Sequence, residues 1–354
     1  MEKNTNNVES QHYPQYSFFK VKGYKWYYYL TAFSLIMISY WGVTTNSDWG
    51  GYEYWFENDA SGTDRAFQFL TIWFNEHGLT FRMLYRFHII LIALFYILLF
   101  RKLRVNPVFY TILMLLFNYV EMGNQIRYYV GFPMALLALY YYINKRFLLS
   151  VLFGVFAFFF HSSLALFFAI FFLFYYCFNG FNNKGKIILV IGANIVLYYL
   201  VHNTDVIGNF EVYLLDRSRI SSLLGGLFNL MPTIIYIYFT YLIDNEIRKC
   251  LPDMVQMKDY KYLYICIMMG TVLFLCSIPT QILAHRMMGM ILMPIWLTYF
   301  IRVKSLGSKK INNLANNCLI VLLLFYTLNA FGVFTGSNDY FYHIKEMLDS
   351  YTLS

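Results

Sequence analysis

Apolar residues in this chain gather in long runs, and polar or charged residues separate one run from the next. The runs have roughly the length that a helix needs to cross a bilayer, about 17 to 25 residues. Strands would alternate apolar and polar residues, and no such alternation is present. The pattern predicts an all-α, polytopic integral membrane protein with about eleven transmembrane helices, near residues 24–44, 87–100, 107–122, 126–143, 147–160, 164–178, 187–201, 223–243, 261–277, 284–301 and 313–333.

The composition supports a membrane protein and excludes a soluble enzyme. Hydrophobic residues make up 59% of the 354 residues, charged residues only 13%, and the mean hydropathy is +0.49. So few polar residues cannot cover a soluble globule. The net charge of +8 is spread in short clusters between apolar runs, as membrane topology requires, so we expect no nucleic-acid partner. We expect one transmembrane domain, residues 1–354, that begins with a polar segment at 1–23.

Basic residues indicate which loops face the cytoplasm, because Lys and Arg are enriched on that side. If the N-terminus is cytoplasmic, the predicted spans place 19 of the 27 basic residues inside. This orientation puts two long loops, 45–86 and 202–222, and the tail 334–354 outside the cell. An apolar and aromatic stretch at 67–74 could then lie in the membrane interface. The cytoplasmic loops are short except for 244–260, so we expect any functional residues in the loops to lie on the external side.

Signals for a metal, a cofactor or a nucleotide are missing from the sequence. The five cysteines share no CxxC spacing, and the external acids and histidines show no ligand spacing. There is no Walker loop, no GxGxxG motif after a strand and no HExxH motif. We therefore expect no metal and no cofactor, and neither ATP coupling nor nucleotide-sugar chemistry.

His161 is the most informative single residue. It divides a 32-residue apolar stretch whose flanks, 145–146 and 184–186, are both basic, so the stretch is expected to be a hairpin with its tip on the external side. The two arms are short, which leaves the tip below the outer surface, where irregular backbone needs surrounding protein or a water-filled cavity. An imidazole there can act as general base or acid. The alternative is a structural turn histidine that binds a backbone carbonyl.

Two arginines open predicted spans on the external side. Arg127 begins the span 126–143, and Arg286 begins the span 284–301. The guanidinium is a permanently charged planar fork that suits phosphate oxygens, so either residue could bind a diphosphate. The alternative for both is an arginine that extends to the membrane interface without a functional role.

The first external loop carries acids and aromatic residues next to the membrane. Asp48 and Glu53 are carboxylates, while Tyr52 has an aromatic face of the type that stacks on sugar rings. An interfacial aromatic belt explains such residues equally well. A third external cluster, around Arg217, is ordinarily just solvated.

Two segments, in this order along the chain, resemble the central signature of the EpsG family of Wzy-like polysaccharide polymerases. Residues 125–132 read Gln-Ile-Arg-Tyr-Tyr-Val-Gly-Phe, and residues 159–164 read Phe-Phe-His-Ser-Ser-Leu. An apolar span, Asn144-Lys145-Arg146 and a second span separate them. Asp48, Tyr52 and Arg286 are also similar to that family, whereas Tyr128 stands where the family often has another polar residue, and the region around Arg217 matches poorly.

The resemblance implies an outward-facing, GT-C-like cavity in the bacterial cytoplasmic membrane. There the protein would join undecaprenyl-diphosphate-linked oligosaccharide repeat units, as donor and acceptor, into an O-antigen, capsule or exopolysaccharide chain. A flippase and a chain-length regulator would be partners beside the membrane lipids, and no metal would be needed. The residues implied are Arg127, Arg286 and Arg217 for the diphosphate, His161, Asp48 and Arg127 for catalysis, and Tyr52, Glu53, Gln125 and Tyr128 for substrate binding.

Two other functions would leave similar residues. A flippase or transporter of lipid-linked sugars would also line a cavity with cations, although polar residues at the midplane and paired discontinuous helices are then expected. Another membrane glycosyl or acyl transferase would also use histidine and arginine, but acyl donors usually arrive from the cytoplasm.

Overall fold

The computed structural model describes residues 23–60, 63–177, 223–277, 293–304, 308–330 and 339–352, together with the isolated residues 185, 188, 192 and 306. Within these ranges the chain forms 15 α-helices and one short 3-10 helix and has no strand, which confirms the all-α class. The helices are α1 (Trp26–Tyr40), α2 (Trp49–Glu57), α3 (Arg65–Glu76), α4 (Phe81–Leu103), α5 (Pro107–Phe117), α6 (Tyr119–Asn124), α7 (Ile126–Ile143), α8 (Phe147–Phe160), η1 (Ser162–Leu164), α9 (Ala165–Cys177), α12 (Leu223–Cys250), α13 (Pro252–Val255), α14 (Lys258–Ser277), α16 (Met293–Lys304), α17 (Lys309–Ala330) and α18 (Asp339–Asp349).

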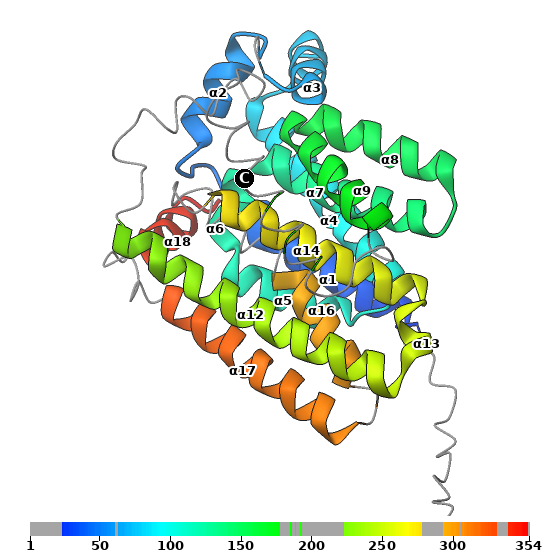
Figure 1. Cartoon of the computed structure of the whole chain (residues 1–354). Coiled ribbons are helices and arrows are strands. Elements are labelled where there is room, and N and C mark those ends of the chain that lie inside the picture. The colour runs from blue at the N-terminus through cyan, green and yellow to red at the C-terminus, as the bar shows by residue number, and fades with distance from the viewer. Residues whose placement is uncertain are drawn as a thin grey trace, which may run out of the picture.

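Helix α7 lies at the centre of the molecule. Nearly all of its side chains are buried, and α4, the hairpin of α8 and α9, and α14 pack around it. Gly131 allows α8 to approach closely, because a Cβ there would lie 3.1 Å from the Ala157 carbonyl oxygen and 2.7 Å from Leu164 Cδ1. Figure 1 shows α2 and α3 above α7 and the hairpin, with α12 and α17 side by side below.

Two predicted boundaries in the first half of the chain are wrong. The span expected at 87–100 is α4, which begins at Phe81 because Thr80 caps it and accepts the Met83 N–H at 3.4 Å. The loop expected to reach residue 86 is therefore shorter, and α2 and α3 occupy most of it. The span expected at 107–122 is broken at Asn118 into α5 and α6, and the Tyr40 hydroxyl donates to the Tyr119 carbonyl oxygen beside the break.

The second half also contains more helix than the apolar runs predict. Helix α12 continues through the expected cytoplasmic loop to Cys250, because Asp244 Oδ2 accepts a 2.7 Å hydrogen bond from Arg248 Nε one turn later. Helix α13 and the start of α14 fill the rest of that loop, and α18 lies in the expected tail. The span at 187–201 and the loop at 202–222 lie almost wholly outside the described residues.

In the described ranges, only α4 is by itself both long and apolar enough to cross a membrane. Residues 107–116, 147–160 and 162–176 form shorter apolar helices. The eleven-span topology therefore stays a prediction. Several helices nevertheless leave large apolar side chains exposed, as α8 does with Leu148, Val151 and Leu152. A lipid environment would cover such a face.

Contacts between distant segments join residues that the charge pattern places on the same side. Arg302 Nη2 donates to the Leu103 carbonyl oxygen at 2.7 Å, and both residues were predicted at cytoplasmic ends. Lys310 Nζ donates to Glu246 Oε1 at 2.8 Å, and this bond lowers the pKa of Glu246. At the other end, Thr352 donates its N–H to the Gly42 carbonyl oxygen at 2.7 Å.

Candidate active site at the start of helix α7

A break between α6 and α7 positions the candidate site. Gln125 leaves the helical path with φ −102° and ψ 51°, so that α7 starts at Ile126. Asn46 Nδ2 donates to the Gly123 carbonyl oxygen at 3.3 Å, and Asn124 Nδ2 donates to Ser47 Oγ. These contacts fasten the break to the segment between α1 and α2. Arg127 consequently lies in the first turn of α7, where its guanidinium faces aromatic rings of α2 and α3.

The guanidinium of Arg127 is enclosed by one carboxylate and several rings. Its Nη1 lies 2.8 Å from Asp64 Oδ2, and the two side chains are only 15% and 10% exposed. The guanidinium carbon lies 5.4 Å from the ring centre of Tyr52, 4.9 Å from that of Trp55 and 5.4 Å from that of Phe67. Such rings attract a cation, more strongly when water is excluded. The cation is thus held in place while its charge is compensated.

The turn of the α8–α9 hairpin reaches the same point. Helix α8 ends at Phe160, and His161 is extended, with φ −156° and ψ 108°. The Ser162 backbone N–H donates to Asp64 Oδ1 at 2.9 Å, and Ser163 Oγ lies 2.8 Å from His161 Nδ1. The predicted order of helix, turn at His161 and helix is therefore confirmed, while the external position of the turn stays a prediction.

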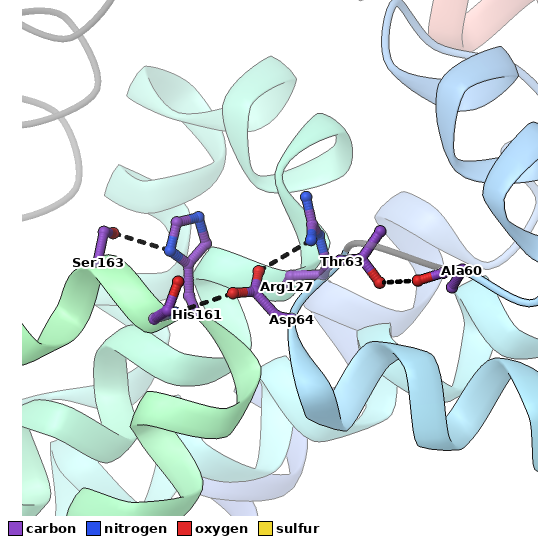
Figure 2. Close-up of polar contacts among 7 residues, drawn as sticks. Ala60, Thr63, Asp64, Arg127, His161 and Ser163 are labelled. Atoms are coloured by element: carbon purple, nitrogen blue, oxygen red, sulfur yellow. Dashed lines mark hydrogen bonds and ion pairs between the residues drawn. The ribbon is translucent and has the colours of Figure 1, made fainter. Parts of the chain in front are cut away.

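Asp64 joins Arg127 to this turn, although the three lie far apart in the sequence. Its two carboxylate oxygens receive donors from two different elements, α7 and the hairpin turn (Figure 2). Sequence reasoning did not single out Asp64. The available signal was an acid three residues before the amphipathic stretch at 67–74, but an acid at that position is ordinarily a helix cap.

The predicted substrate residues and Asp48, a predicted catalytic residue, differ in their relation to Arg127. Tyr52 is buried with its ring beside the guanidinium, and the Tyr128 ring meets the His161 ring edge to face, with centres 5.1 Å apart. Asp48 precedes α2 and lies within electrostatic reach of Arg127. Gln125 forms the break itself. Glu53 is exposed on α2 and takes no part in the described contacts that join Arg127, Asp64 and the turn at His161.

A second histidine that the sequence reasoning missed lies beneath the site. His88 is fully buried on α4, and its Nδ1 lies 2.8 Å from the Leu84 carbonyl oxygen. Its ring packs 5.6 Å from that of Phe67 and 6.1 Å from that of Phe160, measured between ring centres. Because a carbonyl oxygen can only accept, a proton is assigned to Nδ1 of this histidine. The His88 ring thus packs between Phe67 of α3 and Phe160 at the end of α8.

The predicted ligands Arg286 and Arg217 lie outside the described residues. Within those residues, no group of three His, Cys, Asp or Glu side chains is placed to hold a metal ion. The arrangement seen at α7 offers a guanidinium and a backbone N–H that converge on one anion, with an imidazole beside them. These are the groups that a reaction with an anionic leaving group and a proton transfer needs.

Comparisons with known proteins agree with the motif. A family model described as the EpsG family matches residues 25–344. No curated protein matches, and no solved structure matches.

Proposed function

The chain belongs to the EpsG family, which is linked to polysaccharide biosynthesis, and on that premise we propose that it polymerises lipid-linked oligosaccharide repeat units. The reaction takes place on the outer face of the bacterial cytoplasmic membrane. Its donor is a growing glycan on undecaprenyl diphosphate, and its acceptor is a hydroxyl at the nonreducing end of a newly exported lipid-linked repeat unit. The product is an O-antigen, a capsule or an exopolysaccharide.

One observation carries this proposal: Asp64 brings Arg127 and the turn that bears His161 to one point. In the transfer, the acceptor oxygen forms a bond to the anomeric carbon of the donor, and the bond from that carbon to the diphosphate oxygen breaks. Negative charge develops on the leaving diphosphate, where a guanidinium stabilises it. Arg127 supplies this guanidinium at the point where Asp64 meets the hairpin turn, and we assign Arg286 and Arg217 to the same diphosphate.

The acceptor hydroxyl must lose a proton in this step. We propose that the imidazole of His161 accepts that proton. The Ser163 hydroxyl contacts Nδ1 of this imidazole, and the Tyr128 ring packs edge to face against it. An imidazole has a suitable basicity at neutral pH. Asp48 is the rival base. It lies within electrostatic reach of Arg127 and directly precedes α2, whose rings pack on the Arg127 guanidinium.

A strain that lacks this gene tests the function, with the wild-type gene restored as the comparison. We expect the deletion strain to accumulate single lipid-linked repeat units on the outer leaflet, while the restored strain makes long chains. Repeat units trapped on the cytoplasmic leaflet would instead identify a flippase. Long chains with an altered substituent would identify another membrane glycosyl or acyl transferase.

The predicted independence from metal ions has its own test. Membranes that contain the protein should elongate lipid-linked repeat units equally well before and after treatment with EDTA, because arginines replace the metal at the diphosphate. Loss of elongation that divalent ions restore would contradict this part of the proposal.

A further inference from the structure

The Asp64 carboxylate is used in an unusual way for a residue that precedes a helix. Asp64 occupies the N-cap position of α3 in an extended conformation, but its side chain makes no capping hydrogen bond to that helix. Such an aspartate ordinarily accepts N–H groups from the first turn of its own helix. Here both oxygens are directed to other elements, Oδ2 to Arg127 Nη1 at 2.8 Å and Oδ1 to the Ser162 N–H at 2.9 Å (Figure 2).

The two donors around this carboxylate are the kind that bind phosphate. A guanidinium pairs with phosphate oxygens as it does with carboxylates. The Ser162 N–H is a backbone donor, and backbone N–H groups bind phosphate oxygens as they bind the Asp64 carboxylate here. A carboxylate and a phosphate group both present two oxygens to such a pair. Arg127 and the Ser162 N–H thus form an anion-binding position, and the Asp64 carboxylate is the anion that they bind.

We propose that Asp64 is an internal occupant of a phosphate position formed by the Arg127 guanidinium and the Ser162 backbone N–H, and that the substrate diphosphate displaces it. This inference rests on the proposed function and deepens it. It names the Ser162 N–H as a ligand of the diphosphate and Asp64 as the group that competes with it.

The surroundings allow such an exchange without leaving the buried cation bare. Asp64 compensates the charge of Arg127, which lies in a poorly solvated position. When a diphosphate replaces Asp64, the cation remains compensated. The rings of Tyr52, Trp55 and Phe67 hold the guanidinium in either state.

Competition of this kind lowers the apparent affinity for every anion by the fraction of time that Asp64 occupies the position. A diphosphate carries more negative charge than a carboxylate and gains more from the guanidinium. A singly charged anion has no such advantage over Asp64. Because this fraction is the same for every anion, the ratio of their affinities does not change, but at a given concentration only an anion that binds tightly, such as a diphosphate, displaces Asp64.

Binding of inorganic pyrophosphate and of farnesyl diphosphate to the purified full-length protein, measured by calorimetry, tests the inference. Asp64→Asn removes the competing charge, so we expect both probes to bind more tightly, on the order of tenfold. The matched control is Asp59→Asn. Asp59 is exposed, and its φ of 55° suits asparagine, so this variant removes the same charge nearby and should change affinity less than twofold.

The backbone donor can be removed with Ser162→Pro. His161 is already extended, as a residue before proline must be, and the Asp64 carboxylate is the acceptor seen for the Ser162 N–H. We expect this variant to bind pyrophosphate roughly tenfold more weakly than Ser162→Ala, which keeps the N–H. Circular dichroism and thermal unfolding check that each variant is folded.

The outcomes separate the two proposals. Weaker binding of pyrophosphate by Asp64→Asn than by wild type would overturn the inference. The carboxylate would then serve to position Arg127 and would not compete with the diphosphate. If Arg127→Ala abolishes binding while Asp64→Asn and Ser162→Pro bind like wild type, the inference fails and the proposed function survives. If Arg127→Ala binds both probes like wild type, the diphosphate site of the proposed function fails.

Discussion

Arg127 combines a permanent charge with a nearly closed environment of aromatic rings and one carboxylate. This environment fixes the orientation of the planar fork as well as its charge. Lysine at this position would keep the charge, but an ammonium is a point charge without the fork geometry. The site therefore depends on arginine specifically.

We expect Arg127→Lys to reduce glycan elongation about 10²-fold, which is the lower end of the loss seen when one donor to a developing oxyanion is removed. The expected cause is misplacement of the charge relative to the diphosphate. Elongation of lipid-linked repeat units in isolated membranes, at matched expression, measures it. Elongation by Arg127→Lys at the wild-type rate would show that only the charge matters.

Part of this site could be predicted from the sequence. The basic flanks of one apolar stretch predicted the hairpin with His161 at its tip, and the position of Arg127 at the start of an apolar run predicted the outer end of a helix. Asp64 could not be found in this way, because its contacts lie 63 and 98 residues away in the sequence and depend on how α3 packs on α7 and α8. The position of Glu53, exposed on α2, also depends on that packing.

The α8–α9 hairpin reaches Arg127 only because it packs closely on α7. Gly131 provides that closeness, whereas Gly154 on α8 has room, since the nearest atom to a Cβ there would be 3.7 Å away. The apolar runs predicted both helices of the hairpin. They did not predict the break at Asn118 or the early start of α4, because capping and single hydrogen bonds decide those boundaries.

The two glycines give a matched pair of variants. Gly131→Ala should destabilise the protein by ~1–3 kcal/mol, because the new Cβ presses on Leu164 and on the Ala157 carbonyl, and it should also impair elongation. Gly154→Ala should be neutral or stabilising by up to ~1 kcal/mol, since alanine favours a helix over glycine. Thermal unfolding of the purified variants compares them, and equal melting temperatures would contradict the close packing described for Gly131.

At the scale of the whole molecule, long-range contacts separate two ends. Asp64, Arg127 and Ser162 meet near one end, where Thr352 also binds beside Gly42, and Arg302 meets Leu103 at the other. The sign pattern of the loops predicted the same division. The exposed apolar face of α8 and the membership of the EpsG family agree with a membrane protein. That these two ends face opposite sides of the membrane stays a prediction.

Cysteine labelling tests this sidedness. Cys250 is exposed and was predicted on the cytoplasmic side, so in a variant with the other four cysteines replaced it should react with a membrane-impermeant maleimide only in permeabilised cells. Glu57→Cys, exposed at the end of α2, should react in intact cells when Cys250 is also replaced. Labelling of Cys250 in intact cells would contradict the orientation.

The most direct measurement is the length of the surface glycan in strains whose only copy of the gene carries Arg127→Ala or the control Arg65→Ala. Arg65 is an exposed arginine next to Asp64, so the two variants remove the same charge from neighbouring parts of the molecule. We expect single lipid-linked repeat units on the outer leaflet with Arg127→Ala and long chains with Arg65→Ala, at equal protein levels. Long chains of wild-type length with Arg127→Ala would contradict the assignment of this site to polymerisation.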